Sequence, residues 1–281
     1  MKWKMGNTNR EWLGFFKVGQ EMTYGSVDWK EGWYIDCQKE GDIKPAIGVP
    51  LFPTAEQELE NDIQGFKDII ETYIKRVSAL AQDIMEAMAL SLNLPRDFFF
   101  KKYTYDPFTQ MAMLHYPSFH KDKNISNPDD SSKIEKFGTG PHTDQGFLTI
   151  LHQDNVGGLQ VQLKDKPGHY IDAPPIPGTF ICNLGDMLDK STNGYYLSNV
   201  HRVKYNMTGR DRYSFAFFFD PNLDSVPELI PSEFVKQGEK PERWDKQNIH
   251  EGFSGTYGDY FMAKIGRIFP DYVYKSTGKL T

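Results

Sequence analysis

Residues 142–154 of this 281-residue chain read His-Thr-Asp-Gln-Gly-Phe-Leu-Thr-Ile-Leu-His-Gln-Asp. A His-x-Asp triplet opens the segment, an apolar run follows at 147–151, and Gly157-Gly158 lies just beyond its end. Apolar and β-branched residues bounded by turn residues are typical of a buried β-strand. The segment therefore predicts a strand with two metal-ligating side-chain types at its entrance.

The residues on both sides of this segment alternate in the same way between short apolar runs and turn residues. We expect seven strands, at 110–116, 147–152, 159–163, 170–173, 179–184, 199–205 and 212–219. Short strands that follow one another without intervening helices predict a β-sandwich or a jelly-roll barrel. We assign this core to residues 109–220.

Helical patterns flank the expected β core. Apolar residues recur every three or four positions over about 55–92, which predicts one long helix in an otherwise irregular N-terminal region, 1–108. The C-terminal region, 221–281, is expected to be a loop followed by a helix with Thr256 as its N-cap. The polar insert at 118–136 is expected to form a loop or a lid.

The composition excludes several classes of protein. With 39% hydrophobic and 25% charged residues, the chain can fold around a core and is not disordered. A net charge of −6 disfavours nucleic-acid binding, and no run approaches the roughly 20 apolar residues that span a bilayer. Two cysteines form no disulfide framework. We expect a cytoplasmic protein, while its oligomeric state stays open.

Three His-x-Asp triplets occur, so the triplet alone is weak evidence for a metal site. His120 and Asp122 lie in the polar insert, where flexibility opposes a preorganised site, and Asp154 after His152 suits a turn. His142 and Asp144 stand between a glycine-rich segment, 138–140, and an apolar strand. Any of the three triplets could chelate one ion, because residues two apart on an extended chain project to the same side. We prefer His142 and Asp144 as metal ligands, because a glycine-flanked approach with a rigid strand behind it suits the mouth of a barrel.

A third ligand is needed, and His201 lies in a strand context between Val200 and Val203. Two histidines and one carboxylate on one face of the ion form the facial triad of non-haem Fe(II) oxygen chemistry. Zinc with the same ligands, activating water for hydrolysis, is the chemical alternative. Taken alone, His201 is better explained as a hydrogen-bonded core histidine.

Arg212 and Ser214 open the most apolar strand of the chain, and on a strand they share one face. Burying a guanidinium there is costly unless an anion neutralises it. The planar guanidinium and the hydroxyl are well suited to holding a carboxylate. The simpler alternative is an internal salt bridge of Arg212 with Asp211 or Asp220.

These residues resemble the 2-oxoglutarate/Fe(II)-dependent oxygenases of the isopenicillin-N-synthase-like group. The resemblance rests on residues 142–161 and on four later motifs in the family's order. These motifs are Asn183-Leu-Gly-Asp-Met-Leu188, Thr192-Asn-Gly194, Asn199-Val-His-Arg-Val203 and Arg212-Tyr-Ser214. Together the motifs span most of residues 110–220.

The resemblance implies a mainly β fold with flanking helices around a distorted double-stranded β-helix, or jelly-roll, core. It implies that His142, Asp144 and His201 are the iron ligands. It also implies that Arg212 and Ser214 bind the distal carboxylate of 2-oxoglutarate. Tyr116 carries over from the family's Asn-x-Tyr motif as a further co-substrate contact, although Leu114 replaces the asparagine. The implied enzyme is a dioxygenase that uses Fe(II), 2-oxoglutarate and O₂ and releases succinate and CO₂. Its implied substrate is a small organic molecule, and its reaction is a hydroxylation, a desaturation or a ring closure.

Two other functions remain open on the same scaffold. One is an oxidase that omits 2-oxoglutarate, in which Arg212 and Ser214 would hold a substrate carboxylate. The other is an inactive barrel that binds a metal or a ligand. The resemblance also implies that the chain starts inside the fold, so we expect either an open sheet edge or a shortened form.

Overall fold

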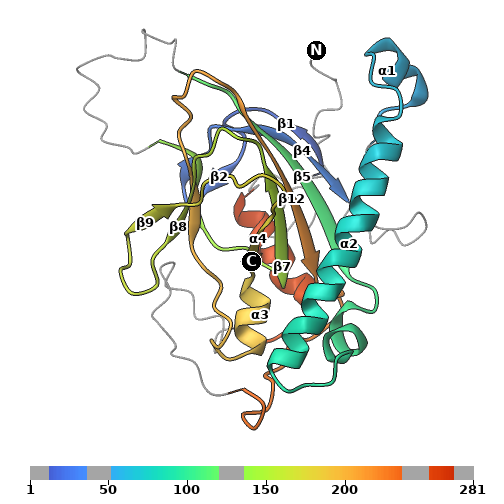
Figure 1. Ribbon diagram of the computed structural model, residues 1–281, viewed down its shortest axis with the longest axis vertical. Helices are drawn as coiled ribbons and strands as arrows, with labels where there is room; N and C mark the ends of the chain where they lie inside the picture. The colour runs from blue at the N-terminus through green and yellow to red at the C-terminus, as the bar shows by residue number, and fades with distance from the viewer. Residues whose placement is uncertain (1–12, 37–51, 120–135, 236–252, 269–281) are drawn as a thin grey trace.

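A computed structural model describes residues 13–36, 52–119, 136–235 and 253–268, in which two β-sheets face each other (Figure 1). The larger sheet has the order β1-β4-β5-β12-β7-β10, and the smaller has the order β6-β11-β8-β9. The larger sheet consists of β1 (Gly14–Phe16), β4 (Glu31–Asp36), β5 (Phe108–Tyr116), β12 (Arg212–Asp220), β7 (Leu148–Gln153) and β10 (Ile181–Leu184). The smaller consists of β6 (Phe137–His142), β11 (His201–Lys204), β8 (Leu159–Gln162) and β9 (Tyr170–Asp172). All pairings within both sheets are antiparallel, as in a jelly roll.

Helices flank this core, and a short hairpin of β2 (Met22–Thr23) and β3 (Ser26–Val27) lies beside β6. The helices are α1 (Ala55–Glu60), α2 (Phe66–Ser91), the π-helix η1 (Phe100–Thr104), α3 (Asp186–Ser191) and α4 (Tyr257–Ile268). The predicted mainly β jelly roll with flanking helices is thus confirmed. None of the described helices has the length and apolar character that a membrane span requires.

The alternation of side chains along β12 separates the core from the interior of the jelly roll. Phe217 and Phe219 pack with buried α2 residues such as Ala81 and Met85 on the outer face of the larger sheet. Arg212 and Ser214 point to the opposite face, toward the smaller sheet, and are 2% and 1% exposed. Because side chains on a strand alternate, the aromatic run anchors the helix and leaves the inner face for polar residues.

The helical pattern at 55–92 forms two helices, so the prediction of a single long helix is wrong in this respect. α1 ends at Glu60, and α2 begins after Gly65, whose φ of 80° is left-handed. A residue in that conformation interrupts an α-helix, and glycine adopts it without steric cost. The apolar period continues across the break and therefore does not reveal it.

The sequence predicts an irregular N-terminal region up to residue 53, and this is also wrong within residues 13–36. β4 pairs with β5 over six residues, and β1 pairs with β4, so the edge of β5 is covered. Gly32 on β4 faces Met113 and Phe16 so closely that a Cβ atom would lie 2.6 Å from the Met113 carbonyl oxygen. Glycine is common in loops, so a glycine that a close strand contact requires makes residues 13–36 look like a loop in the sequence.

All seven predicted strands are present with ends shifted by at most two residues, and α4 begins at the predicted cap. The backbone N–H of Asp259 donates to the Thr256 hydroxyl, and Asp259 accepts from the Thr256 backbone N–H in return. The sequence pattern does not predict β6 or α3. Most of the predicted polar insert, at 120–135, lies outside the described residues, and the division at residues 108 and 220 stays a prediction.

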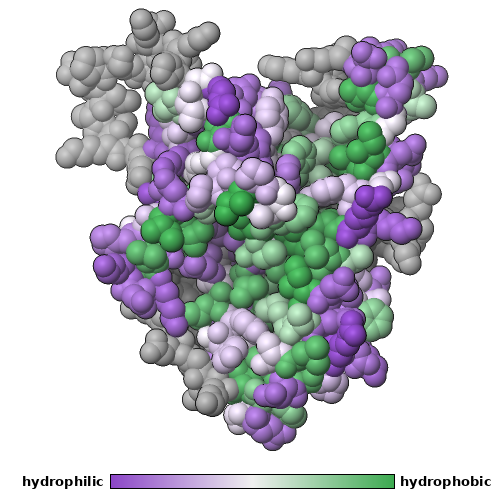
Figure 2. All heavy atoms as spheres, viewed as in Figure 1, coloured by the Kyte–Doolittle hydropathy of each residue, from purple (hydrophilic) through white to green (hydrophobic). Residues whose placement is uncertain are grey.

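Hydrophobic residues gather over the centre and right of the face in Figure 2, where Figure 1 shows α2 and the larger sheet. Hydrophilic residues dominate the margins of the same face. Exposed apolar side chains on α2 include Ile69, at 67%, and Leu90, at 55%. This face is thus mixed in character rather than uniformly charged.

Asp220 ends β12 beneath the turn that leads into β7 and is 5% exposed. The Tyr257 hydroxyl of α4 donates to its carboxylate, and a Cβ atom on Gly146 would lie 1.5 Å from its Oδ1. Burial, and then the charge of Asp144, raise the pKa of Asp220 from 3.8 to about 7. The folded protein therefore favours the protonated carboxyl.

We predict that Asp220→Asn removes a pH-dependent part of the stability. The protonated carboxyl contributes fully to the free energy of unfolding below pH of about 4, and this contribution is lost as the pH rises to about 7. The loss amounts to at most roughly 4 kcal/mol. The free energy of unfolding of the metal-free native protein, minus that of the variant, should fall over this interval. Urea denaturation at a series of pH values measures it.

The matched control is Asp172→Asn, because Asp172 is an exposed aspartate whose pKa is lowered by Lys204 and Gln160. The free energy of unfolding of the native protein, minus that of Asp172→Asn, should stay constant between pH of about 4 and 7. A flat difference for Asp220→Asn as well would contradict the burial of a protonated Asp220.

Candidate metal centre

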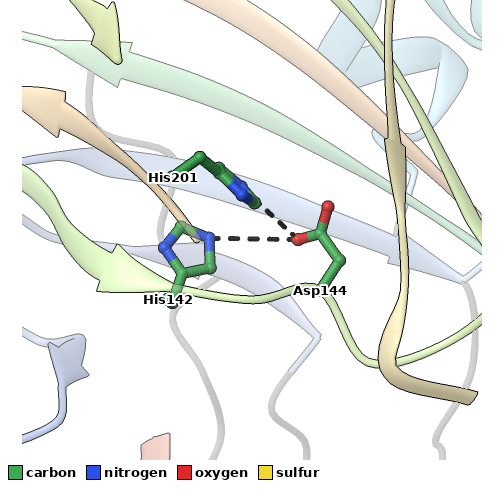
Figure 3. Close-up of side chains that lie close together, drawn as sticks. All are labelled: His142, Asp144 and His201. Atoms are coloured by element: carbon green, nitrogen blue, oxygen red, sulfur yellow. Dashed lines mark ion pairs between the residues drawn. The ribbon is translucent and has the colours of Figure 1, made fainter. Parts of the chain in front are cut away.

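The paired strands β6 and β11 bring His142 and His201 directly opposite each other, since these two residues are register partners. Asp144 follows β6 by two residues, and Figure 3 shows all three side chains pointing toward one point. Asp144 Oδ1 lies 3.9 Å from His142 Nε2 and 3.7 Å from His201 Nε2. These separations exceed hydrogen-bond lengths, so the three atoms surround a gap.

Both imidazole rings are oriented by a backbone carbonyl two residues earlier in the chain. His142 Nδ1 donates to the Gly140 oxygen at 2.8 Å, and His201 Nδ1 donates to the Asn199 oxygen at 3.2 Å. A proton on Nδ1 leaves the lone pair on Nε2, which is the atom that faces Asp144. Ligating histidines are commonly fixed by such a hydrogen bond on the other ring nitrogen.

The electrostatics of the cluster suit a divalent cation. Burial, and then the charge of His201, lower the pKa of His142 to about 4, so its ring is neutral at neutral pH. Asp144 is 7% exposed, and its Oδ1 is the carboxylate oxygen that faces both Nε2 atoms. A cation in the gap would bind this oxygen and accept both Nε2 lone pairs, and two histidines with one carboxylate match Fe(II).

The turn that carries Asp144 is held against the start of α3. The backbone N–H of Asp186 donates to the Asp144 carbonyl at 2.9 Å. Gly185 makes this approach possible, because a Cβ atom there would lie 2.2 Å from the Gly146 carbonyl oxygen. The Asp186 carboxylate accepts in turn from Tyr260 and Lys264 of α4. The C-terminal helix therefore fixes the loop of the candidate ligand.

A buried charged cluster behind β6 holds the other side of the site. Asp28 accepts the backbone N–H of Gly140 at 2.9 Å and forms an ion pair with Lys30 at 3.2 Å. Lys30 also pairs with Glu21 at 2.9 Å and donates to Thr139. The Gly140 carbonyl orients His142, and Asp28 fixes the Gly140 backbone. The charged cluster therefore supports the orientation of His142 through Gly140.

Arg212 is buried on the inner face of the larger sheet and has no protein counter-ion in the described part of the chain. Its Nη1 donates to Ser214 Oγ and its Nη2 to Gln153 Oε1, both at 3.2 Å. No carboxylate forms an ion pair with it among the described residues, and its Nε is buried without a partner there. The Tyr116 ring lies 4.6 Å from the guanidinium carbon, and the Tyr116 hydroxyl bonds Thr139 at 3.1 Å.

An apolar cluster lies between the candidate metal ligands and Arg212. Val203 is two residues beyond His201 on β11, and Ala216 is two residues beyond Ser214 on β12. Both belong to the cluster, which also contains Ala112, Tyr116, Leu151 and Leu159. The interior therefore presents the candidate metal ligands at one end, an apolar middle and a guanidinium at the other end.

The other candidate residues lie elsewhere. His152 is exposed on the outer face of β7, beside Phe180 and Phe215. Asp154 accepts the backbone N–H groups of Val156 and Tyr213, which is the structural role expected for it. His120 and Asp122 lie outside the described residues. Asp211 contacts His115 and Asp220 contacts Tyr257, so neither alternative salt bridge of Arg212 forms.

The sequence model of the 2OG-Fe(II) oxygenase superfamily, a protein family, matches residues 108–221 of this chain. A 1-aminocyclopropane-1-carboxylate oxidase of Dictyostelium mucoroides is 63% identical over all of this chain and 81% of its own length. A probable iron/ascorbate oxidoreductase of Dictyostelium discoideum is 47% identical, covering 96% of this chain and 77% of the relative. The chain belongs to the 2OG-Fe(II) oxygenase superfamily.

Two further superfamily relatives are informative. A homoarginine-6-hydroxylase of Glycine max is 35% identical, covering 92% of this chain and 72% of its own. The crystal structure of a full-length Neurospora crassa protein in complex with alpha-KG superposes with a TM-score of 0.71 and 28% identity, covering 93% of this chain and 75% of that one. The chain is a non-haem iron oxidoreductase of the class that uses Fe(II), 2-oxoglutarate and O₂.

Several residues at this oxygenase site are not singled out by the sequence. Asp28 and Lys30 lie more than 100 positions before Gly140 and resemble ordinary surface residues in an irregular stretch. The resemblance implies a structural role for Gln153 and Asp154, but it does not single out the hydrogen bond that Gln153 Oε1 accepts from Arg212. Asn183 is part of a quoted motif without an assigned role, and its amide lies 3.5 Å from His201 Nε2.

We predict that His142→Ala abolishes tight Fe(II) binding and that His152→Ala leaves it unchanged. Removing one of three ligands opens the cluster, whereas His152 lies on the opposite face of the sheet. Anaerobic titration of each variant with Fe(II) against a competing chelator measures the dissociation constant. Loss of binding in the His152 variant with retention in the His142 variant would refute the placement of the metal.

We also predict that Asp28→Ala weakens Fe(II) binding by roughly 10- to 100-fold, because Gly140 loses the acceptor that fixes its backbone. Asp28→Asn keeps an acceptor oxygen and should retain more of the affinity. The same chelator titration measures both variants, with Asp172→Ala as an exposed control. Equal Fe(II) affinity in the native protein and Asp28→Ala would contradict this role of Asp28.

Proposed function

We propose that His142, Asp144 and His201 hold ferrous iron. The proposal is supported by the three convergent ligand atoms, by the neutral His142 ring and by the burial of Asp144 beside both histidines. Bound iron supplies O₂ activation, coupled to the conversion of 2-oxoglutarate to succinate and CO₂. The backbone carbonyls of Gly140 and Asn199 keep both rings in the tautomer that offers Nε2.

We propose that Arg212 and Ser214 bind the distal carboxylate of 2-oxoglutarate. The buried guanidinium without a counter-ion among the described residues is the observation that carries this proposal. Gln153 orients one guanidinium nitrogen, and the Tyr116 ring lies against the guanidinium. Tyr116 contributes this stacking, while its hydroxyl is directed to Thr139.

The apolar cluster between the two ends has its own part in the reaction. Leu151, Leu159 and Val203 would contact the methylene carbons of the co-substrate and exclude water from the interior. Exclusion of water strengthens the pairing of Arg212 with a carboxylate, because charges attract more strongly where the effective dielectric constant is low. It also limits side reactions at the metal.

We propose that the primary substrate is a small amino acid. The support comes from relatives, one named for 1-aminocyclopropane-1-carboxylate and one for homoarginine, both of which are amino acids. A screen of amino acids for substrate-dependent succinate release tests this proposal. We further propose a cytoplasmic location and no nucleic-acid partner, in line with the net charge of −6 and the free thiol of Cys182.

The second candidate function is an oxidase on the same scaffold that does not consume 2-oxoglutarate. It is favoured by the names of two relatives, which specify an oxidase and an iron/ascorbate oxidoreductase. Under this alternative, Arg212 and Ser214 hold a carboxylate of the substrate itself. The two functions differ in whether 2-oxoglutarate binds at the iron.

We predict that anaerobic addition of Fe(II) and then 2-oxoglutarate produces a visible charge-transfer band. In Arg212→Ala the band should require at least about 30-fold more 2-oxoglutarate, because the distal carboxylate loses its buried cation. Absorbance titration of the iron-loaded protein measures the effect. Arg210→Ala is the control, since this neighbouring arginine is exposed and should leave the titration unchanged.

Two outcomes would count against the main proposal. Iron binding without a band at any 2-oxoglutarate concentration would favour the oxidase or an inactive barrel. A band that titrates identically in the native protein and in Arg212→Ala would mean that 2-oxoglutarate binds elsewhere than against this guanidinium.

A further inference from the structure

Asn183 on β10 lies at the metal end of the interior. Its register partner on β7 is Thr149, which is itself opposite Phe218 of β12. Ile181, two residues earlier on β10, packs against the apolar cluster, whereas Cys182 between them is exposed. Because side chains alternate along a strand, Asn183 shares the inward face with Ile181.

The Asn183 amide has one hydrogen-bonding contact within the described residues, and that contact is with a candidate metal ligand. Its Nδ2 lies 3.5 Å from Nε2 of His201, at the limit of a weak hydrogen bond. His201 Nδ1 donates to the Asn199 carbonyl, so Nε2 is the acceptor in this contact. When iron takes the lone pair of Nε2, the Asn183 N–H loses this acceptor.

The released N–H faces the centre of the metal cluster, and a charged oxygen bound there is a stronger acceptor than a neutral one. The far anchor lies on the same inner face of the larger sheet. Ser214 is four residues along β12 from Phe218, the residue of that strand level with Asn183, which is roughly 13 Å at about 3.3 Å per residue. β10 lies two strands from β12, which adds about 10 Å across the sheet. The Asn183 and Arg212 side chains project inward from these backbone positions and leave a shorter gap for a diacid between them.

We propose that Asn183 binds the iron-chelating carboxylate of 2-oxoglutarate, with its amide N–H donating to a carboxylate oxygen. The inference rests on the proposed function, since it requires 2-oxoglutarate at the iron. Asn183 is then the counterpart of Arg212, and the co-substrate is held at both carboxylates.

The test is the affinity of the anaerobic Fe(II)-loaded protein for 2-oxoglutarate, read from the charge-transfer band. Asn183→Ala should raise the dissociation constant roughly 10- to 100-fold, because it removes a hydrogen bond to a charged group. Asn183→Asp keeps the size of the side chain but opposes a carboxylate with a carboxylate, so it should bind 2-oxoglutarate at least as weakly. Chelator competition for Fe(II) alone should show no more than about threefold loss in either variant, since no iron ligand is removed.

Cys182→Ala is the matched control, because it alters the same strand on its opposite face. It should leave both dissociation constants unchanged. If the native protein gives no band, the proposed function fails, and the role of Asn183 fails with it. If the native protein and both Asn183 variants bind 2-oxoglutarate alike, only the role of Asn183 is overturned.

One further outcome also overturns the inference. If Asn183→Ala weakens iron binding while the iron-loaded variant retains native affinity for 2-oxoglutarate, Asn183 acts by orienting His201. A shift of the band maximum in Asn183→Ala at saturating 2-oxoglutarate supports the proposal, because a hydrogen bond to the chelating carboxylate changes the electron density at the iron.

Discussion

The buried guanidinium of Arg212 imposes the strongest physical constraint on this protein. A charge that is 2% exposed and lacks a counter-ion among the described residues is costly, and the costs of burying unpaired charge are among the largest in folding. Ser214, Gln153 and the Tyr116 ring reduce the cost with hydrogen bonds and stacking, but they carry no negative charge. The interior is thus suited to receive an anion, and in the proposed function that anion is the distal carboxylate of 2-oxoglutarate.

The strands of the jelly roll set the position of this guanidinium relative to the candidate metal ligands. β12 of the larger sheet carries Arg212, and β6 and β11 of the smaller sheet carry the two histidines as register partners. Helix α4 and the N-terminal charged cluster hold the loop of Asp144 and the backbone of Gly140 from opposite sides. Elements that are distant in sequence therefore fix the positions of three side chains.

The strands and the candidate metal ligands are predictable from the sequence, whereas the parts that depend on long-range pairing are not. The aromatic residues at 212–219 predict a strand, and position together with family resemblance singles out His142, Asp144 and His201. β6 escapes prediction because Gly138, Gly140 and Pro141 suggest a turn, and only pairing with β11 makes this segment a strand. The contacts of Asp28 with Gly140 and of Asn183 with His201 join residues that are distant in sequence, so local sequence does not predict them.

A crystal structure grown anaerobically with Mn(II) and 2-oxoglutarate, with anomalous data for manganese, tests the central claim most directly. We expect one anomalous peak, coordinated by His142 Nε2, a carboxylate oxygen of Asp144 and His201 Nε2, with the distal carboxylate of 2-oxoglutarate against Arg212 and Ser214. A metal away from these residues, His201 turned out of the cluster, or Arg212 paired with a protein carboxylate would contradict the account.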